Sequence, residues 1–184
     1  MNRLLLFPGA GSSSTHSSLL AIEAAVAPMP CVRADFPYRL AGRKAPDRPP
    51  VLLQAVRDAA APLLTRRDTL VLGGRSMGGR ICSLAVADEA DPLPARGLVL
   101  ISYPLHPPGK PDTLRVEHFP RLTVPCLFIS GTKDTFGTPG ELTRWTATIP
   151  GPVTHEWMDG KGHDLKGCDA RIASLVAAWI PTIL

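Results

Sequence analysis

Short apolar runs alternate with longer amphipathic segments along this sequence, and that alternation limits the possible folds more than any other feature. Five runs are nearly continuous in Leu, Val and Ile, as in parallel strands that are buried on both faces of a sheet. A sixth run alternates polar and apolar residues, which predicts an edge strand. The expected strands are Arg3–Phe7, Cys31–Phe36, Thr69–Gly73, Gly97–Ser102, Pro125–Ser130 and, at the edge, Val153–Met158.

The segments between these runs carry apolar residues at helical spacing. We expect helices at Ser17–Val26, Val51–Leu64, Met77–Ala87, Pro139–Thr146 and Ala170–Ile180. Strands that alternate with helices predict an α/β fold, with a mostly parallel sheet of about six strands between helices on both faces. This is a three-layer sandwich, and no segment is long enough to form a cap domain. The length of 184 residues predicts a single domain over residues 1–184.

Two connections are longer than a minimal turn, and both are rich in proline. We expect Pro37–Pro50 to be a surface loop and the first half of Tyr103–Thr123 to be irregular, because proline cannot donate a backbone hydrogen bond. The second connection leaves the carboxyl end of a predicted strand, which is where ligands bind in parallel α/β sheets. It is therefore a candidate wall of a binding site.

The composition is typical of a globular protein, with 45% hydrophobic and 20% charged residues. No apolar run has the length of a membrane span, and the run Leu4–Phe7 is too short for a signal peptide. We therefore expect a cytoplasmic protein without a membrane partner. The net charge is +4, but the basic residues are scattered and have no interleaved aromatic residues, so we expect no nucleic-acid partner.

The cysteines and histidines show no metal-ligand spacing. Cys31, Cys82, Cys126 and Cys168 fit neither a CxxC site nor a dense disulfide framework, which indicates reduced structural thiols. The five histidines form no cluster in the sequence and no HExxH motif. We expect no metal and no cofactor.

A glycine-rich stretch, "VLGGRSMGGR" at residues 71–80, lies between a predicted strand and a predicted helix. A phosphate-binding loop that starts at Gly74 would require Lys at position 80 and Ser or Thr at position 81. The sequence has Arg80 and Ile81 there. The stretch instead contains GxSxG, which in this context predicts a nucleophile elbow with Ser76 at its tip.

Two later residues suit the roles of the base and the acid that activate such a serine. Asp134 follows the fifth predicted strand, and His163 follows the sixth, in the chain order serine, acid, histidine that this type of site uses. His163 would take the serine proton while Asp134 orients the imidazole. Taken singly, Asp134 could be a turn or N-cap residue, and His163 a loop histidine. Asp159 and Asp164 are rival acids, although they lie very close to His163 in the sequence.

Two backbone N–H groups would stabilise an oxyanion beside Ser76. One belongs to Met77 at the start of the helix that follows the serine. The other comes from the loop after the first strand, where Ala10 is the preferred donor and Gly9 and Gly11 are alternatives.

Five stretches of the chain together resemble a known group of proteins. They are "FPGAG" at 7–11, "GRSMGGR" at 74–80, "YPLHPPGKP" at 103–111, "VPCLFISGTKDTFGTP" at 124–139 and "GKGHDLK" at 160–166. With them the chain resembles the α/β-hydrolase superfamily, and within it the small hydrolases related to dienelactone hydrolase. It is most similar to the family that contains the testis-expressed protein thirty and the third subunit of the NSL chromatin complex. The resemblance implies Ser76, Asp134 and His163 as the triad positions.

The expected activity is hydrolysis of a small soluble ester or thioester, with a small-molecule acyl substrate in a pocket walled by Tyr103, Leu105 and His106. The alternative is a non-catalytic module with the same fold that binds a protein partner, as some members of the similar family do. Cationic side chains flank the triad positions in sequence and would either favour an anionic substrate or point to solvent. They are Arg75, Lys133 and Lys161. The natural substrate and the oligomeric state stay open at this level.

Overall fold

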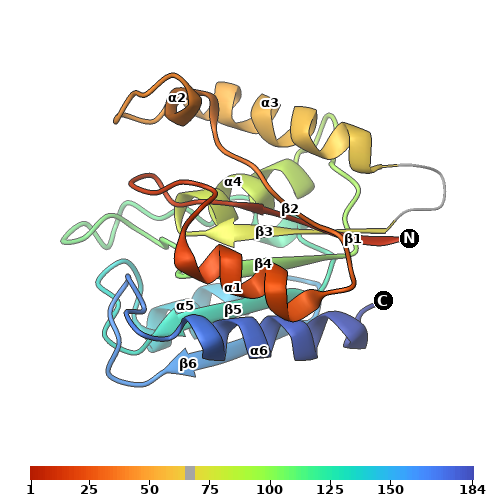
Figure 1. Cartoon of the computed structure of the whole chain (residues 1–184). Helices are drawn as coiled ribbons and strands as arrows, with labels where there is room; N and C mark the ends of the chain where they lie inside the picture. Colours follow the sequence, from red (N-terminus) through yellow and green to blue (C-terminus); the bar gives the residue numbers. More distant parts are fainter. Residues whose placement is uncertain (65–68) are drawn as a thin grey trace.

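The computed structural model describes residues 1–64 and 69–184, and it is built on one six-stranded sheet (Figure 1). Every neighbouring pair of strands is parallel, and the order is β2-β1-β3-β4-β5-β6. The strands are β1 (Asn2–Phe7), β2 (Cys31–Arg33), β3 (Thr69–Arg75), β4 (Gly97–Ile101), β5 (Cys126–Gly131) and β6 (Val153–Met158). The parallel sheet of six strands is thereby confirmed.

Helices cover both faces of the sheet (Figure 1). One face carries α1 (Ser17–Val26) and α6 (Asp169–Trp179). The other carries α2 (Pro37–Leu40), α3 (Pro49–Ala60), α4 (Met77–Val86) and α5 (Pro139–Thr146). Three single 3₁₀ turns lie at Ala61–Leu63, Phe119–Arg121 and Ile180–Thr182.

The side-chain alternation of β1 shows why both faces need covering. Leu4 and Leu6 pack into the core cluster under α1 and α6, whereas Leu5 and Phe7 pack into the cluster under α3 and α4. All four side chains are fully buried, because successive residues of a strand point to opposite faces. An unbroken apolar run therefore marks a strand that lies between two layers of helices.

The second predicted strand is wrong in length and in place. We expected Cys31–Phe36 to be buried on both faces, but β2 ends at Arg33, lies at an edge of the sheet and is only partly buried. The chain leaves the sheet at Asp35, whose carboxylate accepts hydrogen bonds from the N–H and hydroxyl of Ser14, both at 2.7 Å. The opposite edge is β6, as its alternating pattern predicts.

The first proline-rich connection contains a short helix where we expected only a loop. Helix α2 begins at Pro37, and α3 begins at Pro49, two residues before the expected start. Proline suits the first turn of a helix because its missing N–H would have no intrahelical partner there. Tyr38 of α2 is fully buried in the core, so this connection packs against the domain.

The strand order reverses between β1 and β3. From β1 the chain goes outward to β2 and then returns to add β3 on the other side of β1. In open parallel sheets such a reversal leaves a crevice at the carboxyl ends of the two central strands, and ligands bind there. The loop at 8–16 follows β1 and Ser76 follows β3, so both lie at this crevice.

Within residues 1–64 and 69–184, no helix is long and apolar enough to cross a membrane. The four cysteines are free, and Cys82 and Cys126 are buried in the core as small apolar side chains.

Candidate active site

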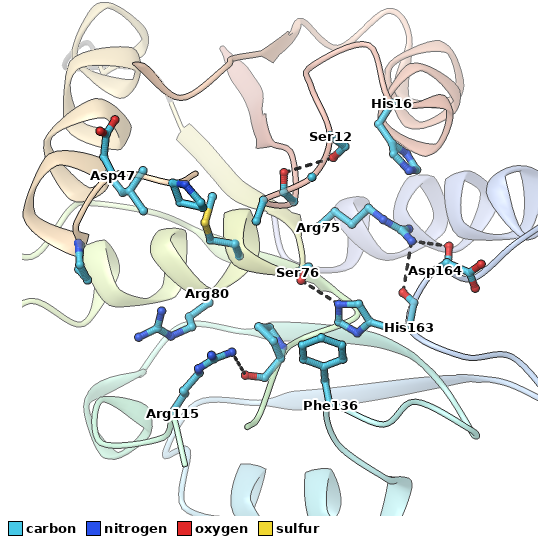
Figure 2. Close-up of a pocket in the computed structure, with 18 residues that line it drawn as sticks. Ser12, His16, Asp47, Arg75, Ser76, Arg80, Arg115, Phe136, His163 and Asp164 are labelled. Carbon is cyan, nitrogen blue, oxygen red and sulfur yellow. Dashed lines mark hydrogen bonds between the residues drawn. The ribbon is translucent and has the colours of Figure 1, made fainter. Parts of the chain in front are cut away.

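Ser76 lies in a sharp turn between the last residue of β3 and the first residue of α4. Its backbone has φ 49° and ψ −118°, a region that residues with side chains rarely occupy and that costs on the order of 1–3 kcal/mol. The turn is held from β4, because the Ser76 N–H donates to the Ile101 carbonyl at 2.7 Å. The strained turn raises the Ser76 hydroxyl into a cavity above the sheet (Figure 2).

The glycines of the turn are required by close backbone packing. A Cβ atom at Gly74 would lie 2.3 Å from the Phe7 carbonyl oxygen. At Gly78 it would lie 2.5 Å from the carbonyl oxygens of both Phe7 and Pro8. Because no real Cβ approaches an oxygen this closely, side chains at these positions would push α4 away from β1. The two glycines of GxSxG thus let Ser76 sit close to the loop after β1.

His163 and Asp134 are brought together by contacts between the loops that follow β5 and β6. The Lys133 N–H donates to the Lys161 carbonyl at 2.8 Å. A Cβ at Gly131 would lie only 2.2 Å from the same Lys161 oxygen, so the loop after β6 lies directly against the end of β5. Gly160 makes the turn with φ +68°, a conformation that glycine adopts without strain.

Ser76, His163 and Asp134 form a continuous chain of hydrogen bonds. Ser76 Oγ lies 2.8 Å from His163 Nε2, and His163 Nδ1 lies 2.8 Å from Asp134 Oδ2 and 3.0 Å from Asp134 Oδ1. An ionised carboxylate can only accept, so Nδ1 carries the proton and Nε2 presents its lone pair to the serine hydroxyl. This arrangement can move a proton from a serine to an imidazole.

The imidazole is held on two sides. Asp134 is 2% exposed, and its Oδ1 also accepts from the Phe136 N–H at 2.8 Å, which fixes the carboxylate. The Phe136 ring stacks on the His163 ring with 4.0 Å between their centroids. Neither rival acid takes this place. Asp159 accepts from the Thr132 hydroxyl at 3.2 Å. Asp164 is exposed, and among the described residues it is Asp134 that accepts from His163 Nδ1.

The loop after β1 presents a backbone donor to the same cavity. The Gly9 carbonyl accepts from the N–H of Ser12 at 3.1 Å and from its hydroxyl at 3.3 Å. Because the peptide is trans, the Ala10 N–H points the opposite way from that carbonyl, and it donates no hydrogen bond within the described residues. A Cβ at Gly9 would lie 3.5 Å from the Ser76 Cβ, so this loop is adjacent to the serine.

Met77 offers a second backbone N–H donor, from the start of α4 rather than from the loop after β1. It is the first residue of α4, and the Ser76 side chain does not cap that helix. The first N–H groups of a helix lack intrahelical acceptors and carry the positive end of the helix dipole. Ala10, Met77, Gly9 and Gly11 all line the cavity around Ser76.

The cavity has a volume of about 660 Å³ and opens at the carboxyl ends of the strands (Figure 2). Its walls come from the loop after β1, the segment that leads into α3, the turn between β3 and α4, and the loops after β4, β5 and β6. Apolar side chains from several of these segments line it, among them Leu52, Met77, Pro104 and Phe136. A volume of this size suits a small organic molecule.

Three predicted wall residues lie elsewhere, which corrects the sequence-based expectation. Tyr103 and Leu105 are buried in the core under α3 and α4, and Tyr103 donates its hydroxyl to the Arg115 carbonyl at 2.7 Å. His106 is buried too, with its Nε2 3.3 Å from a Glu141 oxygen. The proline-rich loop folds inward at these apolar residues, so Pro104 and Arg115 face the cavity in their place.

Arg75 has a role that the sequence did not show. Its buried guanidinium donates to the carbonyl oxygens of His163 (3.3 Å) and Asp164 (Figure 2). Burial lowers the pKa of this guanidinium, while Asp169, Asp164 and Asp134 act in the opposite direction. The end of β3 is thereby tied to the loop that carries the imidazole.

Other cavity residues were also missed. Arg80, Arg115 and Phe136 line the cavity. Arg80 follows Ser76 by four residues, a helical spacing that could have predicted it on the same side of the helix as the serine. Phe136 could have been considered because it lies two residues after Asp134. Nothing in the sequence pattern marks Arg115. Of the other predicted cations, Lys133 is exposed and Lys161 donates to the Lys166 carbonyl at 3.0 Å.

Comparison with known proteins gives a family and a fold. A family model described as an alpha/beta hydrolase domain matches residues 1–178. Est1E from Butyrivibrio proteoclasticus is a solved structure with 15% sequence identity and a TM-score of 0.77, over 98% of this chain and 87% of the other. An alpha-beta serine hydrolase homologue from Coxiella burnetii has 15% identity and a TM-score of 0.76, over 98% and 85%.

A thioesterase is also among the similar structures. RedJ, from the prodiginine biosynthetic pathway of Streptomyces coelicolor, has 20% identity and a TM-score of 0.68, over 100% of this chain and 85% of that chain. At such identities the likeness concerns the fold. A proposal about the chemistry must therefore use this chain's own features. They are the six parallel strands, the reversal between β1 and β3, and the turn at Ser76.

Proposed function

The chain belongs to the alpha/beta hydrolase domain family, and on that premise we propose that it is a serine hydrolase that cleaves small ester or thioester substrates. The observation that carries the proposal is the hydrogen-bonded chain from Ser76 through His163 to Asp134, at 2.8 Å in both steps. Within the family we propose kinship with the small dienelactone-hydrolase-related enzymes, on the stretches at 7–11, 74–80 and 160–166.

In the first half of the proposed reaction, Ser76 Oγ attacks the carbonyl carbon of the substrate while its proton passes to His163 Nε2. The Asp134 carboxylate stabilises the imidazolium that forms. The negative charge that develops on the substrate oxygen is held by the N–H groups of Ala10 and Met77. The bond to the leaving alkoxide or thiolate then breaks, and the proton on Nε2 goes to the leaving group.

In the second half, water enters the place of the departed alcohol or thiol. His163 Nε2 takes one proton from it, and the remaining hydroxide attacks the acyl-Ser76 carbonyl. The bond to Ser76 Oγ breaks, the proton returns from Nε2 to Oγ, and the carboxylic acid leaves. Substrate and water are thereby converted into an acid and an alcohol or thiol, with Ser76 regenerated.

The cavity supports small substrates. Its volume is about 660 Å³, and no cap domain covers it in the described part of the chain. The apolar side chains of Leu52 and Met77 favour a short acyl or aryl group near the serine. The similar fold of RedJ, a thioesterase, supports thioesters beside esters as substrates.

A fluorophosphonate probe tests the proposal, because it labels only serines that are activated as nucleophiles. We expect labelling and turnover of p-nitrophenyl acetate, p-nitrophenyl butyrate and N-acetylcysteamine thioesters by the wild-type protein, and loss of both in Ser76→Ala and His163→Ala. Ser174→Ala is the matched control, since Ser174 lies exposed on α6. If the wild-type protein is neither labelled nor active, the alternative of a non-catalytic binding module replaces this proposal.

A further inference from the structure

Two arginines share one wall of the cavity beside Ser76. Arg80 comes from α4, and Arg115 comes from the long loop between β4 and β5. Figure 2 shows both side chains on the same side of the serine. Each residue is only partly exposed, so both positive charges sit in a recess rather than out in solvent.

No described part of the chain neutralises either arginine. Among the described residues, no carboxylate forms an ion pair with Arg80 or Arg115. The Arg80 Nε is buried, and no residue in the described part of the chain accepts a hydrogen bond from it. Within residues 1–64 and 69–184, the only acceptor for the Arg115 guanidinium is the Pro104 carbonyl, at 3.4 Å. Buried donors are nearly always paired in folded proteins, so the described residues leave the Arg80 guanidinium unusually poor in acceptors.

Among the described residues, no other charged side chain of the cavity forms an ion pair with Arg80 or Arg115. The Arg75 Nη2 is bound to the carbonyls of His163 and Asp164, while its Nη1 is buried without a hydrogen-bond partner among the described residues. Asp47 pairs with Arg43 through Oδ1 at 2.7 Å, and its buried Oδ2 has no hydrogen-bond partner among the described residues. Asp164 is exposed. Burial, and next to it the neighbouring Arg80, lower the pKa of the Arg115 guanidinium, as expected for two like charges that lack an anion between them.

Arg80 is also close enough to Ser76 to contact a small ester that is bound at the serine. Its N–H donates to the Ser76 carbonyl at 3.1 Å, so it lies one helical turn after Ser76, about 6 Å along the helix axis. Side chains of a helix tilt toward its N-terminus, which brings the guanidinium back toward the serine. A small ester at Ser76 can therefore reach it.

We propose that Arg80 and Arg115 form a subsite for an anionic group, a carboxylate or a phosphate, on the ester or thioester that Ser76 cleaves. This inference rests on the proposed function. Two guanidinium groups present planar forks of donors, which match the oxygens of a carboxylate or phosphate. The substrate would thus carry its negative charge within a few bonds of the scissile carbonyl.

Matched esters test the subsite. On the acyl side, mono-p-nitrophenyl adipate is compared with p-nitrophenyl hexanoate. On the leaving-group side, 4-acetoxybenzoate and 4-acetoxyphenyl phosphate are compared with 4-methylphenyl acetate, which separates carboxylate from phosphate. For each pair the quantity measured is the ratio of kcat/KM for the anionic ester to kcat/KM for the neutral one. Dividing the variant's ratio by that of the wild type cancels the intrinsic reactivity of the esters.

We expect Arg80→Gln and Arg115→Gln each to lower this ratio about 10- to 100-fold for at least one anionic ester, chiefly through KM. Arg115→Lys keeps the charge and should retain part of the preference. Arg171→Gln is the matched control: it removes one positive charge from an exposed position on α6 that does not line the cavity. Its ratio should equal that of the wild type.

A binding measurement separates failure of the subsite from failure of the proposed function. Titration calorimetry of adipate and phenyl phosphate is carried out on Ser76→Ala, with and without Arg80→Gln. Binding that is lost with Arg80→Gln supports the subsite even if the protein cleaves no ester. The proposal is overturned if neither anion binds to Ser76→Ala, or if binding persists unchanged with Arg80→Gln. In a protein that cleaves the esters, it is also overturned if the anion preference is absent or persists unchanged in Arg80→Gln and Arg115→Gln.

Discussion

At the scale of single residues, the proposed reactivity of Ser76 would depend on the contacts that hold His163. The imidazole lies between the Ser76 hydroxyl and the Asp134 carboxylate, against the ring of Phe136. The backbone of its loop is bound by Arg75. Each of these contacts fixes a different degree of freedom, so substitutions at them should reduce activity by different amounts and with different effects on stability.

Asp134→Asn should reduce kcat on the order of 10⁴-fold. An asparagine amide can donate to Nδ1, which moves the proton to Nε2 and removes the lone pair that accepts from Ser76. Steady-state hydrolysis of p-nitrophenyl acetate gives the measurement. Asp159→Asn, which changes a carboxylate bound to Thr132, should retain most of the activity. Equal activity of Asp134→Asn and wild type would remove Asp134 from the mechanism.

Arg75→Lys should lower kcat by about 10- to 100-fold, because displacing a catalytic group by around 1 Å costs this much. A lysine side chain keeps the positive charge but is one atom shorter, so its ammonium cannot take the place of the Arg75 Nη2, which donates to the carbonyls of both His163 and Asp164. The rate of fluorophosphonate labelling should fall in parallel. Retention of the full labelling rate would mean that the loop after β6 holds the imidazole without Arg75.

At the scale of elements, the site depends on how closely α4 approaches β1. The gap is set by glycine backbones: a Cβ at Gly78 would meet two carbonyl oxygens at 2.5 Å, whereas a Cβ at Gly140 in α5 would meet no atom within 4 Å. The two glycines are both near the start of a helix. They therefore form a matched pair for separating crowding from helix propensity.

Gly78→Ala should destabilise the protein by about 1–3 kcal/mol, since overpacking forces the backbone to shift. It should also reduce activity, because the same shift moves Ser76 and Met77 away from Ala10. Gly140→Ala should instead be neutral or stabilising, by up to about 1 kcal/mol. Urea unfolding of both variants measures the change in the free energy of unfolding. If Gly78→Ala and Gly140→Ala changed the free energy of unfolding in the same direction, the close approach of α4 to β1 would not be the reason for a glycine at position 78.

At the scale of the whole molecule, the free energy of unfolding should depend on a buried histidine. His118 is 1% exposed, and its Nε2 lies 2.8 Å from the Ser83 hydroxyl of α4. Burial, with smaller effects from Arg80 and Arg121, lowers the pKa of His118 to about 4. In the unfolded chain the pKa of histidine is about 6.5. The folded protein therefore favours neutral His118.

Because the unfolded chain binds the proton first, the contribution of His118 to stability is complete above about pH 6.5 and falls as the pH drops toward 4. The loss approaches about 3 kcal/mol at the lower end, at 1.36 kcal/mol per pKa unit. Urea unfolding at pH 7 and pH 4.5 should show a smaller difference for His118→Gln than for the wild type. The comparison of the two proteins removes the effect of the carboxylates, which also titrate in this range. An identical pH dependence would contradict the assignment.

Much of this fold could be predicted because its determinants are local. The fully buried run Leu4–Phe7 marks a strand covered on both faces, and the alternation in Val153–Met158 marks an edge. The second strand was predicted too long: it ends at Arg33, and two residues later Asp35 accepts hydrogen bonds from the N–H and hydroxyl of Ser14. That contact joins residues 21 positions apart, and no local pattern records it.

The sequence by itself determined the parallel sheet and the positions of Ser76, Asp134 and His163 after their strands, because periodicity, glycine placement and chain order act over short distances. Only the tertiary structure decided which side chains face the cavity. It buried Tyr103 and Leu105 in the core and turned Arg115 toward Arg80. The physical reason is that an irregular loop has no fixed side-chain period, so its inward and outward residues are chosen by packing against elements far away in the sequence.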